Sequence, residues 1–319
     1  MNPYVFVLGC PRSGTTLLQR MLDAHPGLAM INQTRWIADW YEEQIGLTPD
    51  GHVTPELLER LYENPHFTKL GIDRRALEER VGLPSAEVHY SDFVRGVFDL
   101  YGEARGIDRV GEKAPRYVSK LAVLNGLFPE TRFIHIIRDG RDVALSVAQW
   151  KKGAGVARGM ATYADQPIAT IAVWWDWLVR LGREAGSPLG PDRYFELRYE
   201  SLIARPAEEA TGMCRFLDLP YDEAMLRFHE GRTKDDPELD AKKAWRPVTS
   251  GLRDWRTQMA ADELERFEAA AAGLLDELGY ERAAPRPGRA AGRVASRVRD
   301  SFLRELGAGK QPVPRSWAA

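Results

Sequence analysis

A glycine-rich loop in the stretch YVFVLGCPRSGTTLL is the first set of residues that could bind a ligand. Gly9 and Gly14 have the spacing of the nucleotide loop G-x-x-x-x-G-K-[ST], whose lysine contacts the β and γ phosphates. Thr15 stands in place of that lysine, and Arg12 supplies a cation earlier in the loop. A glycine turn before a helix points several N–H groups at one place, where the helix dipole adds about half a positive charge. We therefore predict an anion site whose ligand lacks a triphosphate and a metal; a ligand-free turn is the alternative.

An arginine and a serine follow the apolar run in RFIHIIRDGRDVALSV. Arg138 is expected at the carboxyl end of a strand, where open α/β sheets bind ligands. Ser146 follows about two turns into the next helix. A guanidinium and a hydroxyl placed in this way could hold one phosphate from two sides. Asp139 is interpreted as a helix cap, and Arg141 with Asp142 as a solvated charge pair.

The apolar pattern predicts the elements that position these residues. Residues 5–8, 132–137 and 193–197 are short β-branched or aromatic runs, each followed by a turn and a helical pattern. This alternation indicates an α/β fold, a P-loop-like sandwich with a central parallel sheet flanked by helices. Residues 39–117 have mainly helical spacing and are predicted to be a helical insertion in a domain that covers residues 1–282.

Composition restricts the class of protein. The 319 residues are 44% hydrophobic and carry a formal charge of -2, so we expect a sizeable core and no nucleic-acid partner. The two cysteines have no metal-ligand spacing and predict neither a disulfide framework nor a metal site. No basic leader precedes the first apolar run, and no run approaches the length of about 20 residues that a membrane span needs, so we expect a soluble, cytoplasmic protein. Residues 283–319 are rich in arginine and are predicted to be a partly disordered tail or a peripheral helix.

The loop PRSGTTLLQRMLDAHP, together with Arg138 and Ser146, resembles the nucleotide-binding motifs of PAPS-dependent sulfotransferases. Within that family the chain is most similar to the tyrosylprotein sulfotransferases and related bacterial enzymes, over about residues 4–280. The resemblance implies 3′-phosphoadenosine 5′-phosphosulfate (PAPS) as co-substrate, 3′-phosphoadenosine 5′-phosphate (PAP) as product, and no metal. It implies in-line transfer of a sulfuryl group to a hydroxyl or an amine, and a place in bacterial secondary metabolism.

The resemblance also implies which residues bind the nucleotide. The 3′-phosphate would be bound by Arg138 and Ser146, and Tyr199 would flank the adenine, although a core aromatic is the alternative. The stretch WRPVTSGLRDWR resembles the late loop that closes over the donor, with Gly251 and Arg253 in it; a plain surface loop is the alternative. The residues expected to bind the 5′-phosphosulfate are those of the first loop: Arg12, Ser13, Gly14, Thr15, Thr16 and Leu17.

Two cations are expected to stabilise the oxygen that leaves sulfur. Arg12 is one of them. Lys113 is the other, because it precedes Pro115, a helix-start signal that would fix its backbone, and because the family has a lysine in the same context. The chain departs from the family after Ser146, where Trp150 replaces a further arginine of the tyrosylprotein sulfotransferases.

The proton acceptor is a second departure from the family. The family has a glutamate where this chain has Gln33, in INQTRW. Glutamine cannot accept a proton, although it can orient a hydroxyl group. The acceptor could be acidic enough to react without a base, as a phenol with a pKa of about 10 would be, and we favour this interpretation. Alternatively another residue serves as the base, or the chain binds the donor with little turnover. The candidate bases are Asp39, Glu42, Glu112 and His25.

The acceptor is predicted to be a small molecule. Aromatic residues gather in the segments expected to line its side of the site, which favours an aromatic acceptor, although helix-core packing is their more frequent use. We expect no nucleic-acid or membrane partner, and a homodimer is one expected assembly. The competing functions are a P-loop small-molecule kinase, which the missing lysine disfavours, and a PAP- or PAPS-binding protein with little turnover. The aromatic residues in question are Trp36, Trp40, Tyr41, Trp150, Trp174, Trp175 and Trp177.

Overall fold

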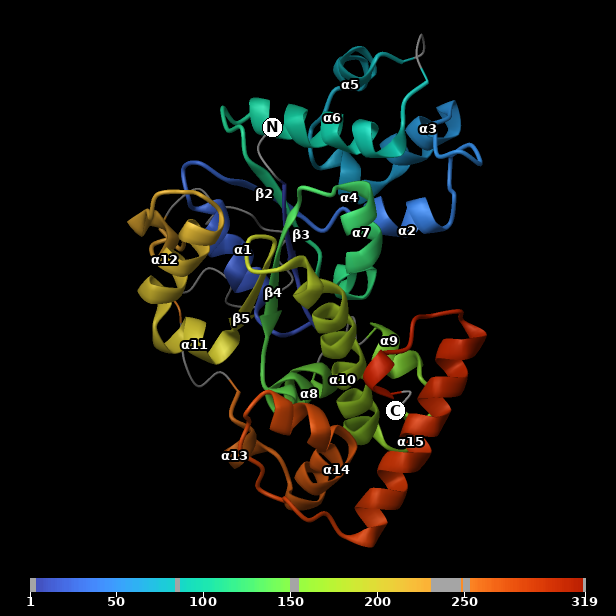
Figure 1. Cartoon of the computed structure of the whole chain (residues 1–319), viewed down its shortest axis with the longest axis vertical. Helices are drawn as coiled ribbons and strands as arrows, with labels where there is room; N and C mark the ends of the chain where they lie inside the picture. The colour runs from blue at the N-terminus through green and yellow to red at the C-terminus, as the bar shows by residue number, and fades with distance from the viewer. Residues whose placement is uncertain (1–3, 84–86, 150–154, 231–247, 249–252, 318–319) are drawn as a thin grey trace.

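A five-stranded parallel sheet forms the centre of the protein (Figure 1). The structure is a computed structural model that describes residues 4–83, 87–149, 155–230, 248 and 253–317. The strand order is β2-β3-β1-β4-β5, and every neighbouring pair is parallel. This sheet, with helices on its faces, confirms the predicted α/β fold. The strands are β1 (Val5–Leu8), β2 (Ala29–Asn32), β3 (Val110–Lys113), β4 (Arg132–Ile137) and β5 (Tyr194–Arg198).

Helices fill the connections between the strands, as parallel pairing requires. The described α-helices are α1 (Thr15–Asp23), α2 (Ile37–Glu42), α3 (Pro55–Glu63), α4 (Pro65–Thr68), α5 (Arg74–Val81), α6 (Tyr90–Glu103), α7 (Leu121–Leu127), α8 (Gly140–Ala148), α9 (Gly155–Gly159), α10 (Pro167–Gly186), α11 (Tyr199–Ala204), α12 (Pro206–Phe216), α13 (Trp255–Gln258), α14 (Ala261–Glu277) and α15 (Arg289–Ala308). A 3₁₀ turn, η1 (Pro115–Lys120), links β3 to α7.

Alternate residues of β1 face two apolar layers. Phe6 and Leu8 pack in one cluster with residues of α6, α7 and α10. Val5 and Val7 pack in a second cluster with residues of α1 and α12. Figure 1 shows α1, α11 and α12 on one side of the sheet and α7 and α10 on the other. Because both faces of β1 are buried, this strand is apolar throughout.

The apolar pattern predicts three of the five strands, and β2 and β3 are additional. The sequence of β3 is VGEK, which contains two charged residues, yet all four residues are buried because the strand lies between β2 and β1. Gly111 is required there, since a Cβ atom would lie 2.6 Å from the Met30 sulfur and 2.7 Å from the Val5 carbonyl oxygen. Residues 39–117 thus hold β3 as well as most of α2 and all of α3 to α6. The domain boundaries stay a prediction.

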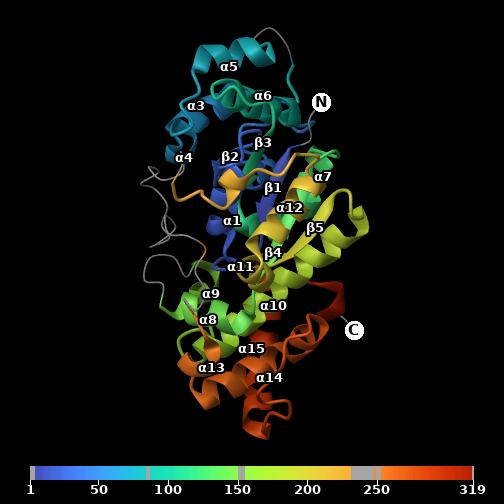
Figure 2. The same ribbon diagram turned by 90° about the vertical axis from the view of Figure 1, so that its left-hand side faces the viewer.

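The arginine-rich end of the chain consists mostly of one long helix, α15, which packs against α10 and α14 (Figures 1 and 2). After the helix, the Trp317 ring lies edge-on to the Phe302 ring, with 6.0 Å between the centroids. The Trp317 indole N–H donates to Asp176 of α10 at 3.2 Å. The buried residues of α15 recur at helical spacing and are Ala291, Ala295, Val298, Phe302 and Leu306.

Three further features concern membrane-spanning helices, metal-ligand groups and disulfides. Among the described helices, none is long and apolar enough to cross a membrane. The described residues contain no group of three or more His, Cys, Asp or Glu side chains that could hold a metal ion. Cys10 and Cys214 are both buried and free.

Candidate active site

The glycine-rich loop joins β1 to the N-terminus of α1. Gly14 is the N-cap of α1 and has φ of 94°, in the left-handed region that favours glycine. A Cβ atom at Gly14 would lie 2.4 Å from the Tyr199 ring, so glycine also allows the ring to approach the loop. The residues after it, Thr15, Thr16 and Leu17, form the first turn of α1. Their N–H groups lack partners within the helix and are free to bind an anion.

The loop and the second motif meet directly. Arg12 Nε donates to the Ser146 hydroxyl oxygen at 3.0 Å, although the two residues are 134 positions apart. They can meet because β1 and β4 are adjacent, with Leu8 opposite His135 in the register. Arg12 has φ of 78°, an uncommon conformation for a residue other than glycine, of the kind that clusters at functional sites.

Arg138 lies beside this contact. Its guanidinium is 4.3 Å from the centre of the Tyr199 ring, and its Nη2 atom is 3.3 Å from the Asp142 carboxylate. The Trp175 indole N–H donates to the Arg138 carbonyl oxygen at 3.2 Å, which ties the end of β4 to α10. Tyr199 begins α11 directly after β5 and so lies at the same edge of the sheet as the loop. Five of the predicted residues therefore form one cluster: Arg12, Gly14, Arg138, Ser146 and Tyr199.

Two of the predicted binding residues carry a buried donor that has no hydrogen-bond partner in the described part of the chain. These donors are Ser13 Oγ and Arg138 Nε. A buried polar group without a partner is costly, and a cluster of such groups calls for an explanation. Both atoms can donate a hydrogen bond, and one belongs to a cation. A ligand with several anionic oxygens, such as the two phosphate groups of PAPS, fits this donor set.

Of the late stretch, the structure describes Val248 and the residues from Arg253 onward, and Gly251 lies outside the described residues. Arg253 Nη2 donates to the side-chain oxygen of Gln149, at the end of α8, at 2.9 Å. The backbone N–H of Trp255 donates to Asp142 at 3.0 Å. These contacts place the start of α13 against α8, the helix that carries Ser146.

One interpretation of the second motif is wrong. Asp139 is the N-cap of α8, as predicted, and accepts a hydrogen bond from the Arg141 N–H. Arg141 and Asp142, however, are not a solvated charge pair. The Arg141 side chain is 1% exposed and pairs with Asp139 at 2.8 Å and with Glu268 at 2.5 Å. The sequence gives no sign of this network because Glu268 is far away in the chain. Asp142, in contrast, could have been linked to Arg138, because only four positions separate them across the start of α8.

Lys113 and Gln33 are brought together on the other side of the loop. Lys113 is the last residue of β3, is 3% exposed, and lies opposite Val7 of β1. The Gln33 backbone N–H donates to the Lys113 carbonyl oxygen at 3.0 Å. Gln33 has φ of 41°, and its side-chain oxygen accepts two hydrogen bonds from Arg35, at 3.2 and 3.0 Å. The turn that carries Gln33 is therefore attached to the strand that carries Lys113.

Two of the candidate bases have other roles. His25 is buried, and its ring nitrogens contact the Pro220 carbonyl oxygen at 2.8 Å and the Gly27 N–H at 2.9 Å. Both nitrogens of His25 are thus used to hold the chain after α1. Glu42 forms an ion pair with Lys120 on the surface.

Glu112 is the most unusual of the four candidates. It is fully buried, and one carboxylate oxygen accepts hydrogen bonds from the Thr34 N–H at 2.7 Å and the Thr34 hydroxyl at 2.8 Å. The other oxygen has no partner in the described part of the chain. Burial raises the pKa of Glu112 to about 7 despite the Thr34 hydrogen bonds and the nearby Lys113. Burial also raises the pKa of Asp39.

Several aromatic residues expected near the acceptor are core residues. Trp36 is fully buried and packs against the rings of Phe67, Tyr90 and Phe93. Trp174, Trp175 and Trp177 are buried in α10, and Trp150 lies outside the described residues. Trp40 and Tyr41 are only partly buried, so these two remain candidates for an acceptor surface.

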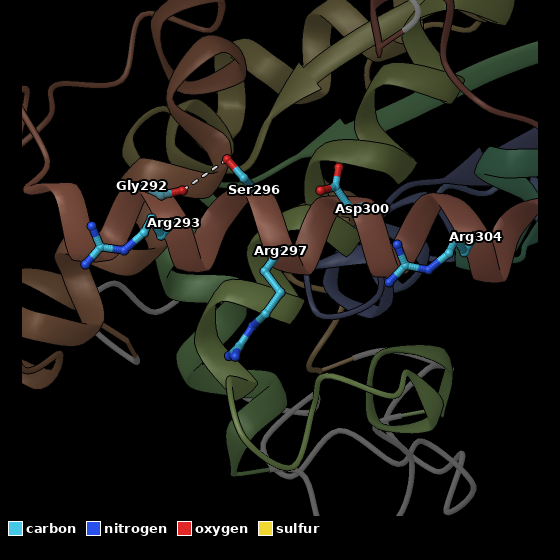
Figure 3. Close-up of a pocket in the computed structure, with 6 residues that line it drawn as sticks. All are labelled: Gly292, Arg293, Ser296, Arg297, Asp300 and Arg304. Carbon is cyan, nitrogen blue, oxygen red and sulfur yellow. Dashed lines mark hydrogen bonds between the residues drawn. The ribbon is translucent and has the colours of Figure 1, made fainter.

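A shallow pocket lies away from this cluster, on the outer face of α15 (Figure 3). It carries charges of both signs on one exposed helix, and a hydrogen bond of 3.2 Å joins Ser296 to the Gly292 carbonyl oxygen. None of the predicted site residues lines it. Its lining residues are Gly292, Arg293, Ser296, Arg297, Asp300 and Arg304.

Comparison with known proteins gives one consistent family. A model of the sulfotransferase family matches residues 3–223. A putative protein-tyrosine sulfotransferase of Caenorhabditis briggsae is 27% identical over 288 residues, which cover 89% of this chain and 91% of the relative. Protein-tyrosine sulfotransferase 1 of Danio rerio is 26% identical over 98% of this chain and 81% of its own length. The chain matches only 52% of the length of the Drosophila melanogaster protein-tyrosine sulfotransferase, at 27% identity.

Two solved structures share the fold. The sulfotransferase domain from the curacin biosynthetic pathway has a TM-score of 0.61 at 20% identity, covering 88% of this chain and 99% of that domain. The sulfotransferase domain of the Synechococcus PCC 7002 olefin synthase has a TM-score of 0.56 at 24% identity, covering 88% and 95%. Both agree with the predicted fold class.

Proposed function

The chain belongs to the sulfotransferase family, and on that premise we propose that it transfers a sulfuryl group from PAPS to a hydroxyl or amine of a small molecule, without a metal. Family membership confirms the predicted class of enzyme, a PAPS-dependent sulfotransferase similar to the protein-tyrosine sulfotransferases. The proposal concerns which residues bind the donor, how they act, and what kind of acceptor they serve.

The observation that carries the proposal is the 3.0 Å contact between Arg12 and Ser146. It brings the loop proposed for the 5′-phosphosulfate next to the residues proposed for the 3′-phosphate. Arg138 and Ser13 add buried donors without partners to the same cluster. A nucleotide with phosphate groups at both ends of its ribose would use these donors from two sides, with Tyr199 against its base.

The proposed reaction is an in-line displacement at sulfur. The acceptor oxygen or nitrogen attacks the sulfur, the bond between sulfur and the bridging oxygen breaks, and that bridging oxygen becomes a phosphate oxygen of PAP. Negative charge grows on the leaving oxygen, so fixed cations accelerate the step. Arg12 and Lys113 are proposed for this role because one lies in the loop and the other ends the neighbouring strand.

The acceptor must lose a proton to the solvent or to the protein. Gln33 has no proton-accepting group, so we propose that it orients the acceptor hydroxyl with its amide. A phenol suits such a site because its pKa of about 10 makes it more acidic than an alcohol. Two relatives are named protein-tyrosine sulfotransferases, and the side chain of tyrosine is a phenol. A small phenolic acceptor is therefore our first choice. The cytoplasmic location, the homodimer and the role in secondary metabolism stay predictions.

Calorimetry tests the donor. We expect PAP to bind, and ATP with Mg²⁺ to bind at least tenfold more weakly, because the loop lacks the lysine that contacts a γ phosphate. Tight binding of ATP with Mg²⁺ and none of PAP would favour the kinase alternative.

Transfer of label from [³⁵S]PAPS into a panel of phenols, alcohols and amines tests the acceptor. We expect phenols to be sulfated fastest. If PAP binds but no member of the panel is sulfated, the alternative of a PAP-binding protein with little turnover gains support.

A further inference from the structure

The Asp142 carboxylate connects two parts of the molecule. One of its oxygens lies 3.3 Å from Arg138 Nη2, and the other accepts a hydrogen bond of 3.0 Å from the Trp255 backbone N–H. The Asp142 side chain is 14% exposed. A single carboxylate in the first turn of α8 thus contacts both the arginine proposed for the 3′-phosphate and the first residue of α13.

The ionised form of the Asp142 carboxylate is stabilised by both Arg138 and the Trp255 N–H. Burial raises the pKa of Asp142, while the Arg138 charge and the Trp255 N–H favour its ionised form. A largely buried carboxylate that loses one partner keeps the cost of its desolvation without the compensating contact. Arg138 therefore helps to hold Asp142 in position for Trp255, and Trp255 helps to hold Asp142 in position for Arg138.

Other contacts fasten the same segment to α8. The Arg141 guanidinium lies 3.6 Å from the centre of the Trp255 ring, and that ring is 5% exposed. Arg253 donates to Gln149 at the far end of α8. Ser146, between these points on α8, contacts Arg12 of the glycine-rich loop. The helix is therefore in contact with the proposed nucleotide site and with residues 253–258 at once.

We propose that Asp142 is a positioning residue that couples nucleotide binding at Arg138 to the docking of residues 253–258 on α8. The inference rests on the proposed function, because it takes Arg138 as a ligand of the 3′-phosphate. Asp142 orients the guanidinium before the phosphate arrives, which reduces the entropy lost on binding. Because coupling between two sites is reciprocal, a phosphate that fixes Arg138 also stabilises the docked segment. That docking brings Arg253, which donates to Gln149, to the helix that carries Ser146.

Two substitutions separate the two contacts. Asp142→Asn keeps an oxygen for the Trp255 N–H but removes the charge opposite Arg138, whereas Asp142→Ala removes both. The exposed Arg256 side chain stacks on the outside of the Trp255 ring at 4.5 Å, so Arg256→Ala is the matched control. Thermal unfolding of each variant establishes that it is folded.

The first measurement is hydrogen exchange of the Trp255 amide without nucleotide. We expect exchange in Asp142→Asn and Arg256→Ala within threefold of the wild type, and exchange in Asp142→Ala at least tenfold faster. A folded Asp142→Ala variant with the wild-type exchange rate would overturn the docking role of Asp142.

The second measurement is PAP binding by calorimetry, with exchange repeated in saturating PAP. We expect Asp142→Asn to bind PAP about tenfold more weakly than the wild type, and PAP to slow Trp255 exchange in the wild type but not in Asp142→Ala. Wild-type PAP affinity in Asp142→Asn would overturn the coupling. If Asp142→Ala does not fold, the PAP affinity of Asp142→Asn alone tests the coupling. If PAP does not bind the wild type, the proposed function fails and the coupling with it, while the first measurement still judges the docking contact.

Discussion

The buried carboxylate of Glu112 makes a quantitative prediction about stability. Its pKa rises from an ordinary value of 4.5 to about 7 in the folded protein, because burial disfavours the charged form. The folded state therefore favours the protonated group, and its stabilising effect is fully present below pH 4.5 and is lost as the pH rises through about 7. At 1.36 kcal/mol per pKa unit, this loss is about 3 kcal/mol in the free energy of unfolding.

The assay is urea unfolding of the wild type and of Glu112→Gln between pH 4.5 and 8. Glutamine keeps an oxygen for the two Thr34 hydrogen bonds but cannot ionise. His135, whose pKa burial lowers to about 3, loses its stabilising effect as the pH falls below 6.5 and so has the opposite slope. Both proteins contain His135, so its effect cancels when the difference between their free energies is taken.

We expect that difference, wild type minus Glu112→Gln, to fall by about 3 kcal/mol across this range. Glu56→Gln is the control, because Glu56 is exposed and pairs with Arg60 on the same helix. Its difference from the wild type should change by less than about 1 kcal/mol. A difference for Glu112→Gln that stays constant with pH would refute the inference that Glu112 is desolvated in the folded protein.

Two further predictions concern the site itself. Gln33→Glu should raise the rate of sulfuryl transfer from PAPS to a phenol, because it supplies the missing proton acceptor. The control is Gln44→Glu, because Gln44 is exposed and has the same left-handed backbone, with φ of 55°. An unchanged or lower rate in Gln33→Glu would show that the proton acceptor does not limit the rate at this site. Gly14→Ala should lower the free energy of unfolding by about 1–3 kcal/mol and weaken PAP binding, because its backbone is left-handed and its Cβ would meet Tyr199. Gly126→Ala in α7 is the matched control, since a Cβ there meets nothing within 4 Å and alanine favours the helix. Calorimetry measures the PAP affinity of both variants, and urea unfolding measures their stability. Equal PAP affinity and equal free energy of unfolding in the two variants would contradict the close approach of Tyr199 to the loop.

The sequence predicts the parts of the fold that have strong local signals. β1 and β4 are uninterrupted apolar runs, and the loop after β1 has glycines at a spacing with a known physical use. β2 and β3 lack such a signal. Each has only four residues, and β3 contains Gly111, Glu112 and Lys113, which do not look buried by themselves. Their burial depends on the pairing of β3 with β2 and with β1, which joins distant parts of the chain.

The site shows the same division. The residues in the two motifs could be named from their types and spacing. The partners that hold them could not, because Glu268 binds Arg141 and Trp255 binds Asp142 only after α13 and α14 have packed on α8 and α10. The mistaken interpretation of Arg141 as solvated follows from this, since a charged residue on a short helix is exposed unless a distant carboxylate covers it.

The proposed donor site requires that two separated motifs bind the two phosphate groups of one nucleotide. Calorimetric titration of the wild type, Arg138→Ala and the exposed control Arg215→Ala with PAP and with adenosine 5′-monophosphate tests this requirement. The wild type and Arg215→Ala should bind PAP at least tenfold more tightly than the monophosphate, and Arg138→Ala should lose that preference, about 2 kcal/mol for a charge-assisted contact. Equal affinity of the wild type for the two nucleotides, or a preference for PAP that survives in Arg138→Ala, would contradict it.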